Sequence, residues 1–408
     1  MRIVIISDWF SEKMGYAENC LPKALAALGH EVHLITSDVQ PYFNSPEYKL
    51  AYEPFIGPPI VPCEVKRIDG YTLHRLPHTA CANGFRIRNL LETLRVLRPH
   101  IVQTFDVLCR TTLEAALARP FLGYKLFVAS HKHASVSPEA AREVKWGLGR
   151  WLEWIALRAP RGRLVSWLCE KCYPISSDAA DIAVRFAKVQ PHKISLCSLG
   201  VDTDLFKPST EESAQQVRTQ LRRQFGFMAD NIVCIYTGQL SNNKHPLCLA
   251  RAIHILAQDG LPFRGLFVGN GPQAENIRSC RGCTVYPFVP YRELPSFYWA
   301  ADIGVWPRQE STSQLDAAAC GLPIILSNSV EERERVIGNG LVFQEDNHED
   351  LARRIATLTD RALRAQLGTF GAEKMRKQFS WRHLAELRAQ DYETSLNTKD
   401  VCTKRSIT

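Results

Sequence analysis

The sequence predicts an α/β protein with two doubly wound, Rossmann-like domains, and three observations support this fold class. A chain of 408 residues is too long for one ordinary domain and suits two. Short continuous apolar runs recur along it, as in parallel strands that are buried on both faces of a sheet. These runs alternate with segments of helical length and fall into two series. Because ligands of such folds bind beyond the carboxyl ends of the strands, a cleft between the domains is expected.

The first series occupies the N-terminal half of the chain. Residues 3–7 form a continuous apolar strand, and residues 21–28 carry an apolar helical face that ends at Gly29. A second strand follows at residues 32–35, which completes a strand–helix–strand unit. Further strands are predicted at residues 101–105 and 126–129, and helices near residues 90–97 and 112–117.

The second series begins near residue 231, after a polar and charged linker at about residues 200–230. Its predicted strands are residues 232–236, 265–269, 284–286, 303–306 and 323–326, with a helix at 247–257. The predicted domains are therefore residues 1–198 and 199–378, followed by a closing helix at 379–396 and a flexible tail at 397–408.

Composition excludes several classes of protein. No apolar run approaches the ~20 residues needed to cross a bilayer, and the N-terminus has no secretory signal, so a cytoplasmic location is expected. Thirteen scattered cysteines do not suggest a disulfide framework. The two Cys-x-x-Cys pairs, at residues 169–172 and 280–283, lie in different predicted domains, so a shared zinc site is not expected. A net charge of +8 suits anionic partners. Nucleic-acid binding is not predicted, because only this charge and the two Cys-x-x-Cys pairs would support it.

The segment at residues 306–323 carries the most chemistry. A buried strand ends at Trp306, a polar loop follows, and a helix is predicted from about Ser313 to Gly321. The hydroxyls of Ser311, Thr312 and Ser313, with the free N–H groups of the first helical turn, form a natural seat for an anion. Asp316 lies one turn later, where a carboxylate can accept hydrogen bonds from a ribose diol. An ordinary helix cap with a solvated acid is the alternative.

This segment resembles the signature of the retaining GT-B glycosyltransferases of family four, the group 1 glycosyl transferases. Members carry an acid followed by Ala-x-Ala-x-Gly-x-Pro, and the residues from Asp316 to Pro323 match that pattern. Members usually carry another glutamate, separated from this acid by seven residues, whereas Arg308 stands at that position in this chain and the nearest acid is Glu310. Either the loop is shorter, which places Glu310 near the transferred sugar, or the first acid is lost. The shorter loop is favoured.

Further segments resemble the family in the expected order. Residues 199–208 match a structural crossing segment, so their Asp-x-Asp is not expected to bind metal. The strand-loop at residues 236–244 normally supplies an Arg and a Lys to the donor diphosphate. Lys244 is retained after Gly238, but Gln239 stands where Arg is usual, and Arg308 is a candidate replacement for the missing cation. Two more donor contacts are expected from the resemblance, at Gly269 and, near the nucleotide base, at Phe288.

The N-terminal half resembles the family more weakly. Gly15 is the candidate for a glycine loop that faces the donor phosphates. His131, rather than His133, is the candidate for the catalytic-face histidine after a middle strand. With a pKa near 6.5, such a side chain can stabilise charge or position hydroxyls at neutral pH.

The resemblance implies an enzyme that moves a sugar, with retention, from a UDP- or GDP-linked donor to a glycan or lipid-linked acceptor. It implies no metal or other cofactor, donor binding by residues 199–378, and an acceptor side in residues 1–198. Another GT-B activity, such as a sugar-nucleotide epimerase or a phosphorylase-like enzyme, is an alternative. A non-catalytic nucleotide-sugar sensor or partner subunit is a further one, because Gln239 and the altered first acid depart from the family pattern. A nicotinamide dehydrogenase is disfavoured, because the first loop lacks Gly-x-Gly-x-x-Gly.

Residues 142–172 combine tryptophan with positive charge. Leu148, Trp151, Trp154 and Ile155 share one helical face, and basic residues outnumber acidic ones around them. Aromatic, basic helices can lie on anionic membranes, which would suit a peripheral protein at the inner membrane face and a lipid-linked acceptor. The favoured alternative is a helix that packs its tryptophans into the N-terminal core.

Overall fold

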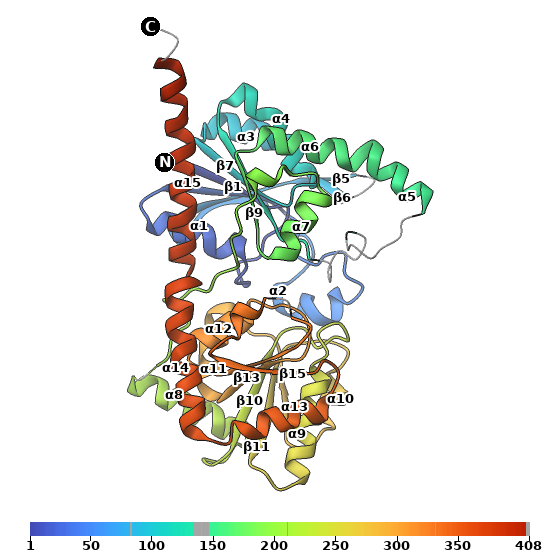
Figure 1. The fold of residues 1–408 in the computed structure, drawn as a ribbon, viewed down its shortest axis with the longest axis vertical. Coiled ribbons are helices and arrows are strands. Elements are labelled where there is room, and N and C mark those ends of the chain that lie inside the picture. Colours follow the sequence, from blue (N-terminus) through green and yellow to red (C-terminus); the bar gives the residue numbers. More distant parts are fainter. Residues whose placement is uncertain (82–83, 134–139, 141–146, 210, 331, 405–408) are drawn as a thin grey trace. The chain divides into compact units, whose positions relative to one another are not determined.

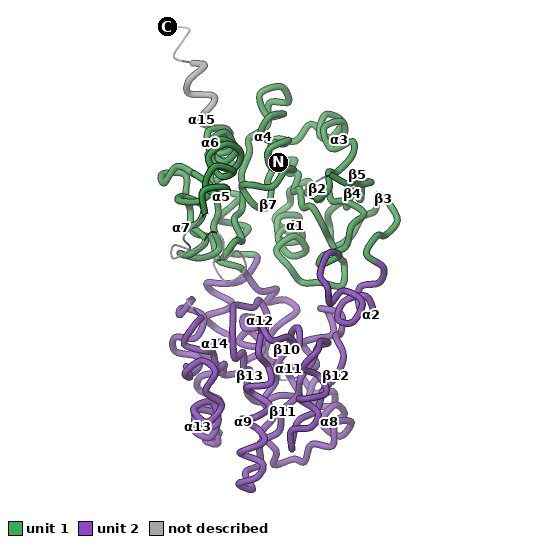
Figure 2. The backbone as a smooth tube through the Cα atoms, turned by 90° about the vertical axis from the view of Figure 1, so that its right-hand side faces the viewer, with its two compact units in different colours: residues 1–43, 59–199, 382–408 green, residues 44–58, 200–381 purple. Residues whose placement is uncertain are grey.

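The computed structural model describes the whole chain except residues 82–83, 134–139, 141–146, 210, 331 and 405–408 (Figure 1). It consists of two compact units (Figure 2). Unit 1 contains residues 1–43, 59–199 and 382–408, and unit 2 contains residues 44–58 and 200–381. The predicted domain limits therefore need two corrections. Residues 44–58 belong to unit 2, and most of the closing helix belongs to unit 1.

Unit 1 is built on a seven-stranded sheet in the order β3-β4-β2-β1-β7-β8-β9. All neighbouring strands are parallel except the antiparallel pair β3 and β4. The central strands β1, β7 and β8 are apolar runs buried on both faces, which is why the sequence predicted them. The strands are β1 Arg2–Ile6, β2 Glu31–Ser37, β3 Glu64–Ile68, β4 Tyr71–Leu76, β7 Ile101–Phe105, β8 Lys125–Ser130 and β9 Lys171–Pro174, with a separate hairpin of β5 His78–Cys81 and β6 Gly84–Ile87.

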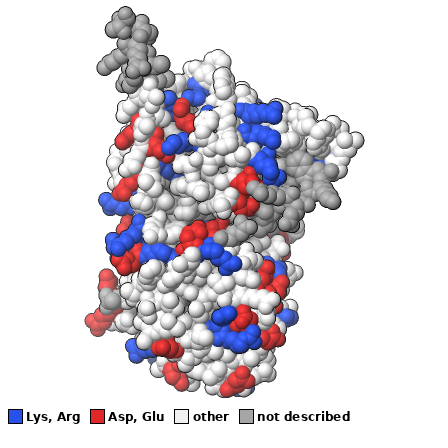
Figure 3. Space-filling view, viewed as in Figure 1, with Lys and Arg blue, Asp and Glu red and all other residues white. Residues whose placement is uncertain are grey.

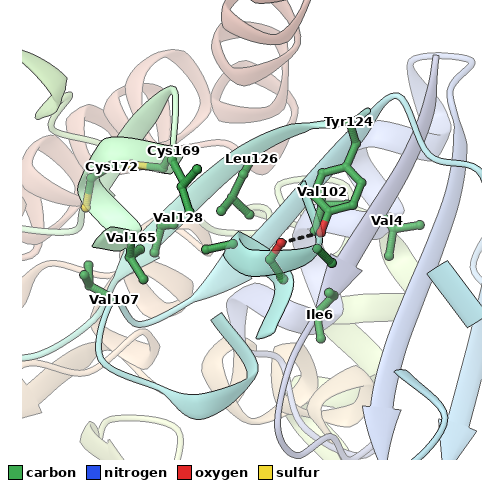
Figure 4. Packing of buried hydrophobic residues seen from close by; sticks show 14 of the residues in the cluster. Val4, Ile6, Val102, Val107, Tyr124, Leu126, Val128, Val165, Cys169 and Cys172 are labelled. Carbon is green, nitrogen blue, oxygen red and sulfur yellow. Dashed lines mark hydrogen bonds between the residues drawn. The ribbon is translucent and has the colours of Figure 1, made fainter. Parts of the chain in front are cut away.

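Helices pack against this sheet and complete its core. On one face, Val4, Val102 and Leu126 lie in a buried apolar cluster to which α4 and α6 contribute, and Tyr124 donates its hydroxyl to the carbonyl of Ala115 at 2.5 Å (Figure 4). The helices of unit 1 are α1 Ala17–Ala27, α3 Leu90–Leu97, α4 Arg110–Leu122, α5 Leu148–Glu153, the π-helix η3 Trp154–Arg158, α6 Ala159–Leu168 and α7 Ser177–Arg185.

The closing helix α15, Trp381–Lys404, starts later and runs further than predicted. The Tyr392 ring lies 4.6 Å from that of Phe127, so α15 packs on the sheet of unit 1. The predicted flexible tail is helical as far as Lys404, and residues 405–408 lie outside the described part of the chain. Within the described residues, no helix is both long enough and apolar enough to cross a bilayer.

Unit 2 is built on a six-stranded, fully parallel sheet in the order β12-β11-β10-β13-β14-β15. The strands are β10 Ile232–Thr237, β11 Phe263–Val268, β12 Cys283–Tyr286, β13 Ile303–Trp306, β14 Ile324–Ser327 and β15 Gly340–Phe343. The α-helices are α2 Glu53–Ile56, α8 Glu212–Gln224, α9 Pro246–Gln258, α10 Ala274–Arg278, α11 Leu294–Ala300, α12 Ser313–Ala319, α13 His348–Thr357 and α14 Arg361–Gln378. Two doubly wound parallel sheets confirm the predicted fold class.

Candidate active site

The topology of unit 2 marks the position that ligands favour in doubly wound sheets. Its strand order runs outward from β10 through β11 to β12, and then resumes on the other side of β10 with β13. The loops after β10 and β13 diverge at this switch point, and crevices at such points hold the ligands of doubly wound sheets. These loops, residues 238–245 and 307–312, contain most of the predicted donor residues.

Lys244 anchors the loop that follows β13. Its ammonium donates a hydrogen bond to the carbonyl oxygen of Glu310 at 2.9 Å. The carbonyl of Gln309 accepts a hydrogen bond from the side-chain amide of Gln314 at 3.1 Å. The carbonyl of Ser311 accepts one from the guanidinium of Arg335 at 3.5 Å. Side chains thus hold three successive carbonyl groups, which helps Gln309 to keep its left-handed φ of 61°. Lys244 lies at the centre of this anchored loop.

Charges of both signs surround the Lys244 ammonium. Burial lowers its pKa from the ordinary lysine value, the Glu310 carboxylate raises it, and the Arg335 guanidinium lowers it again. A bound anion would favour the charged ammonium, because opposite charges at short range stabilise each other in a poorly solvated place. The site therefore suits a further negative charge.

The three predicted hydroxyl residues lie at the start of α12. The hydroxyls of Ser311 and Ser313 are 2.6 Å apart, and Ser313 donates to the carbonyl of Thr237, at the end of β10, at 3.2 Å. Thr312 is half-buried and directly precedes the helix. The helix has only seven residues and ends two residues before the predicted Gly321, so its dipole is small. An anion seat here depends mainly on the hydroxyls and on the nearby ammonium.

Asp316 is almost completely buried on α12, with 2% of its surface exposed. Burial raises the pKa of its carboxyl well above the ordinary value, a hydrogen bond from Tyr291 at 3.4 Å lowers it, and Asp202 raises it. This environment overturns the alternative of a solvated acid. A carboxyl group can accept hydrogen bonds in either protonation state, so the contact with a ribose diol remains a prediction.

Arg308 is already engaged by acidic side chains. Its Nε lies 2.7 Å from a Glu345 oxygen, and its Nη2 contacts the carboxylate of Asp346. Two carboxylates compete with a phosphate for this guanidinium, so the structure lends no support to Arg308 as the replacement cation. That exchange of roles remains a prediction.

Close backbone contacts join the loops after β10 and β11. A Cβ on Gly269 would lie 1.9 Å from the carbonyl oxygen of Gly238, which itself has a φ of 146°. Backbone hydrogen bonds tie the same loops together, from Gly238 N to the Val268 carbonyl at 3.1 Å and from Leu240 N to the Asn270 carbonyl at 2.8 Å. Both glycines therefore have a packing role, whatever contact they make with a ligand.

Two predicted donor residues contact the segment of residues 44–58, which belongs to unit 2. The side-chain amide of Gln239 donates to the Glu47 carboxylate, and the ring of Phe288 stacks on that of Tyr52 with centroids 6.1 Å apart. Neither contact could be predicted from the sequence, because the partners lie 192 and 236 positions apart along the chain.

Sequence reasoning missed Glu332 and Arg335, which lie in the loop after β14. Both are buried, with 4% and 1% of their surface exposed. The pKa of the Glu332 carboxyl is raised to about 7, mainly by burial; Arg335 lowers it, while the charge of Glu310 and a hydrogen bond between the two carboxyl groups raise it. Arg335 also donates to the Gln314 side chain at 3.2 Å. A dense charged run at residues 331–335, directly after a buried strand, was the only available signal.

In unit 1, Gly15 lies in the loop between β1 and α1. The sheet of unit 1 has its own switch point between β1 and β7, so this loop also starts at a favoured ligand position. Asn19 holds the loop, because its Oδ1 accepts from the Tyr16 N–H at 3.2 Å and its Nδ2 donates to the Ser11 carbonyl at 2.9 Å. A contact between Gly15 and donor phosphates remains a prediction.

His131 follows β8, as expected, and its electrostatic environment favours one of the two roles predicted for it. Burial, Arg388 and His133 together lower the pKa of its imidazole to about 3, so the ring is neutral at physiological pH. Its Nε2 is buried and has no hydrogen-bond partner among the described residues. A neutral His131 can position a hydroxyl group, but it cannot supply the positive charge that an ordinary histidine offers.

The two cysteine pairs lie in different units. Cys169 and Cys172 lie in unit 1, Cys280 and Cys283 lie in unit 2, and all four are free thiols. Within the described part of the chain, no group of three or more His, Cys, Asp or Glu side chains has the arrangement of a metal site.

Comparisons with known proteins agree with this architecture. Residues 231–361 match the family model "Glycosyl transferases group 1", and residues 21–205 match "Glycosyltransferase Family 4". Spore coat protein SA of Bacillus subtilis is 25% identical over 48% of this chain and 57% of its own length. The chain spans little more than half of each of the first four curated relatives, 51–57% of their lengths.

Two further matches extend along nearly the whole chain. A protein of Mycobacterium tuberculosis, named GDP-mannose-dependent alpha-(1-6)-phosphatidylinositol monomannoside mannosyltransferase, is 24% identical over 94% of this chain and 96% of its own. The solved structure of HepE from Anabaena in complex with UDP has a TM-score of 0.67 at 17% identity, covering 97% of this chain and 100% of that one. This chain therefore has the GT-B fold and belongs to the group 1 glycosyl transferases of glycosyltransferase family 4.

Proposed function

We propose that this chain transfers a sugar from a UDP- or GDP-linked donor to a glycan or lipid-linked acceptor, with retention of configuration. The observation that carries the proposal is the Lys244 ammonium fixed on the Glu310 loop, at the switch point of unit 2. Because the chain belongs to a family of glycosyltransferases, we assign this cation to the leaving group of a sugar donor. The choice of nucleotide is supported by the relative named as GDP-mannose-dependent and by the similar structure that holds UDP.

The proposed reaction needs charge stabilisation more than an enzymatic nucleophile. The bond between the anomeric carbon and the diphosphate breaks, the acceptor oxygen bonds to that carbon, and a diphosphate oxygen takes the acceptor proton. Lys244 and the hydroxyls at residues 311–313 stabilise the negative charge that develops on the leaving group. Glu310 lies beside the transferred sugar, and a neutral His131 orients a hydroxyl group. In this proposal no metal ion or other cofactor is required.

A transfer assay tests the proposal. The purified protein, treated with EDTA, is incubated with UDP- or GDP-sugars selected by thermal shift and with a set of glycan and lipid acceptors. We expect acceptor-dependent release of nucleoside diphosphate, a product with the anomeric configuration of the donor by NMR, and no product from Glu310→Ala. Donor binding without turnover would favour the nucleotide-sugar sensor. Release of an altered sugar without an acceptor would favour an epimerase.

We further propose that the surface formed by α5, η3 and α6 contacts an anionic membrane, which would bring the enzyme to a lipid-linked acceptor. No residue of α5 or η3 is buried, and Leu148 and Trp151 are 74% and 47% exposed. Trp154 packs towards Phe186 and donates its indole N–H to the Phe186 carbonyl at 2.9 Å. Of the described tryptophans in this region, only Trp154 packs inward as the favoured prediction expected, because Trp151 and Trp167 are exposed. Trp146 lies outside the described residues.

Positively charged side chains lie beside the exposed apolar residues of α5 and η3. Figure 3 shows Lys and Arg side chains over the α6 region, next to the largely uncharged surface of α5. Within α5, η3 and α6 the basic residues are Arg150, Arg158, Arg161 and Arg163, against Glu153 as the single acid. Basic and aromatic side chains together suit the headgroup region of an anionic bilayer.

Vesicle co-sedimentation tests the membrane contact. Replacing Leu148 and Trp151 together with serine should weaken binding to phosphatidylglycerol vesicles by about tenfold, because two exposed apolar side chains no longer enter the interface. Phe370→Ser, which removes an exposed aromatic ring from unit 2, is the control and should bind as the wild type does. Binding that does not depend on anionic lipid, or on residues 148 and 151, would contradict the proposal.

A further inference from the structure

Residues 44–58, the 44–58 segment, leave unit 1 after β2 and pack on unit 2 before the chain returns (Figure 2). The segment forms a short π-helix, η1 Tyr48–Tyr52, which continues into α2 Glu53–Ile56. Most of its large apolar side chains are turned inward, and Leu50 is the exposed exception. The buried residues of the segment are Tyr48, Ala51, Tyr52, Phe55 and Ile56.

The segment contacts the loops that hold predicted donor residues. At one end, the Glu47 carboxylate accepts a hydrogen bond from the side-chain amide of Gln239. In the middle, the carbonyl of Ala51 accepts from the Asn270 side chain at 3.2 Å. Gln239 follows β10, and Asn270 directly follows Gly269, so both contacts lie at the carboxyl edge of the sheet.

The other end of the segment covers Phe288. The Tyr52 ring is stacked on the Phe288 ring with centroids 6.1 Å apart and an interplanar angle of 17°. The Phe55 ring lies 5.5 Å from Phe288 at an angle of 36°. The aromatic side chain expected near a nucleotide base therefore already has two aromatic neighbours.

These contacts have the chemistry of the proposed donor. A nucleotide diphosphate presents negative charge at one end and a flat aromatic ring at the other. The segment presents the Glu47 carboxylate to Gln239 and the Tyr52 ring to Phe288. The Gln239 NH2 group has two N–H donors, and Glu47 occupies one of them with a carboxylate whose negative charge repels a phosphate at the other.

We propose that the 44–58 segment is a donor-mimicking strap, which occupies the nucleotide site of unit 2 and must be displaced before a nucleotide diphosphate binds. Glu47 and Tyr52 then set the affinity for the donor, although in the proposed reaction they contact neither donor nor acceptor. The inference rests on the proposed function, because it needs a nucleotide to bind at this edge of the sheet.

The C-terminal end of the segment is suited to movement. Gly57 has a φ of 93°, a conformation that other residues rarely adopt, and no atom lies within 4 Å of a Cβ built on it. Pro58 and Pro59 follow and stiffen the return to unit 1. The chain can therefore turn at Gly57 while the residues beyond it keep their conformation.

Calorimetric titration with UDP and GDP tests the strap. Glu47→Ala and Tyr52→Ala each remove one of its contacts, so a larger fraction of molecules is open and the apparent Kd should fall by about tenfold. Glu53→Ala is the matched control, since it removes a carboxylate from the same segment without a contact to Gln239 or Phe288, and its Kd should equal that of the wild type. Melting curves of each variant verify that it is folded.

Hydrogen exchange gives an independent readout. Peptides covering the 44–58 segment should exchange faster when UDP or GDP is bound, although a ligand normally slows exchange at its own site. Slower exchange there, or weaker binding by Glu47→Ala and Tyr52→Ala, would overturn the strap and leave the proposed function standing. If neither the wild type nor the two variants binds any nucleoside diphosphate, both the strap and the proposed function are overturned.

Discussion

Replacing Lys244 with alanine is expected to lower kcat for sugar transfer by about 10²–10³-fold, the typical loss when one preorganised donor to a developing negative charge is removed. The ammonium is the cation that unit 2 places on the Glu310 carbonyl, at 2.9 Å. Without the ammonium, the negative charge on the departing diphosphate is less stabilised. The Glu310 carbonyl also loses the hydrogen bond that anchors its loop. Steady-state kinetics with a saturating donor measures the effect on kcat separately from that on KM.

Lys377→Ala is the control for this prediction. Lys377 pairs with Glu373 on the exposed side of α14, so its loss should leave the kinetics unchanged. Burial lowers the pKa of the Lys244 ammonium in the free enzyme, so kcat/KM of the wild type should fall at a lower alkaline pH than an ordinary lysine would predict. If Lys244→Ala kept more than a third of the wild-type kcat, the proposed electrostatic role would be wrong.

Replacing Gly269 with alanine is expected to destabilise unit 2 and to abolish donor binding. The new Cβ would lie 1.9 Å from the carbonyl oxygen of Gly238, a backbone atom that can move away only with its loop. Overpacking of this severity costs about 3 kcal/mol, which for a unit of this size lowers Tm by roughly 6–12 °C. Differential scanning calorimetry measures the loss of stability, and a nucleotide titration measures the loss of binding.

Gly149→Ala provides the matched control. It is the same substitution in an exposed helix, where no atom lies within 4 Å of the new Cβ. Alanine favours helix over glycine, so Tm should be unchanged or slightly raised. An unchanged Tm in Gly269→Ala would mean that the loops after β10 and β11 are not as tightly joined as the structure has them.

Much of the fold could be predicted because its information is local. The strands at residues 232–236 and 303–306 are continuous apolar runs, which buried parallel strands require, and they were found to within a residue or two. The loop with Lys244 and the loop with Glu310 follow those strands, so the order of elements alone brings them to one edge of the sheet. Strands β3 to β6 were not predicted, because their polar, partly exposed sequences lack a continuous apolar run.

The rest of the site depends on contacts that no local pattern encodes. The engagement of Arg308, a candidate phosphate ligand, by Glu345 and Asp346 from the loop after β15 is visible only in the structure. The neutral state of His131 follows from burial and from Arg388 on α15, more than 250 positions away along the chain. The packing of residues 44–58 on unit 2 likewise depends on tertiary contacts.

Isothermal titration of the wild type and of Lys244→Ala with UDP, GDP and the corresponding nucleosides tests the central claim, that unit 2 binds a nucleotide through its diphosphate. We predict that one diphosphate binds the wild type, that its nucleoside binds at least tenfold more weakly, and that Lys244→Ala largely removes this difference, since the charge-assisted contact is gone. Equal binding of nucleoside and diphosphate by the wild type, or a difference that survives intact in Lys244→Ala, would contradict the account.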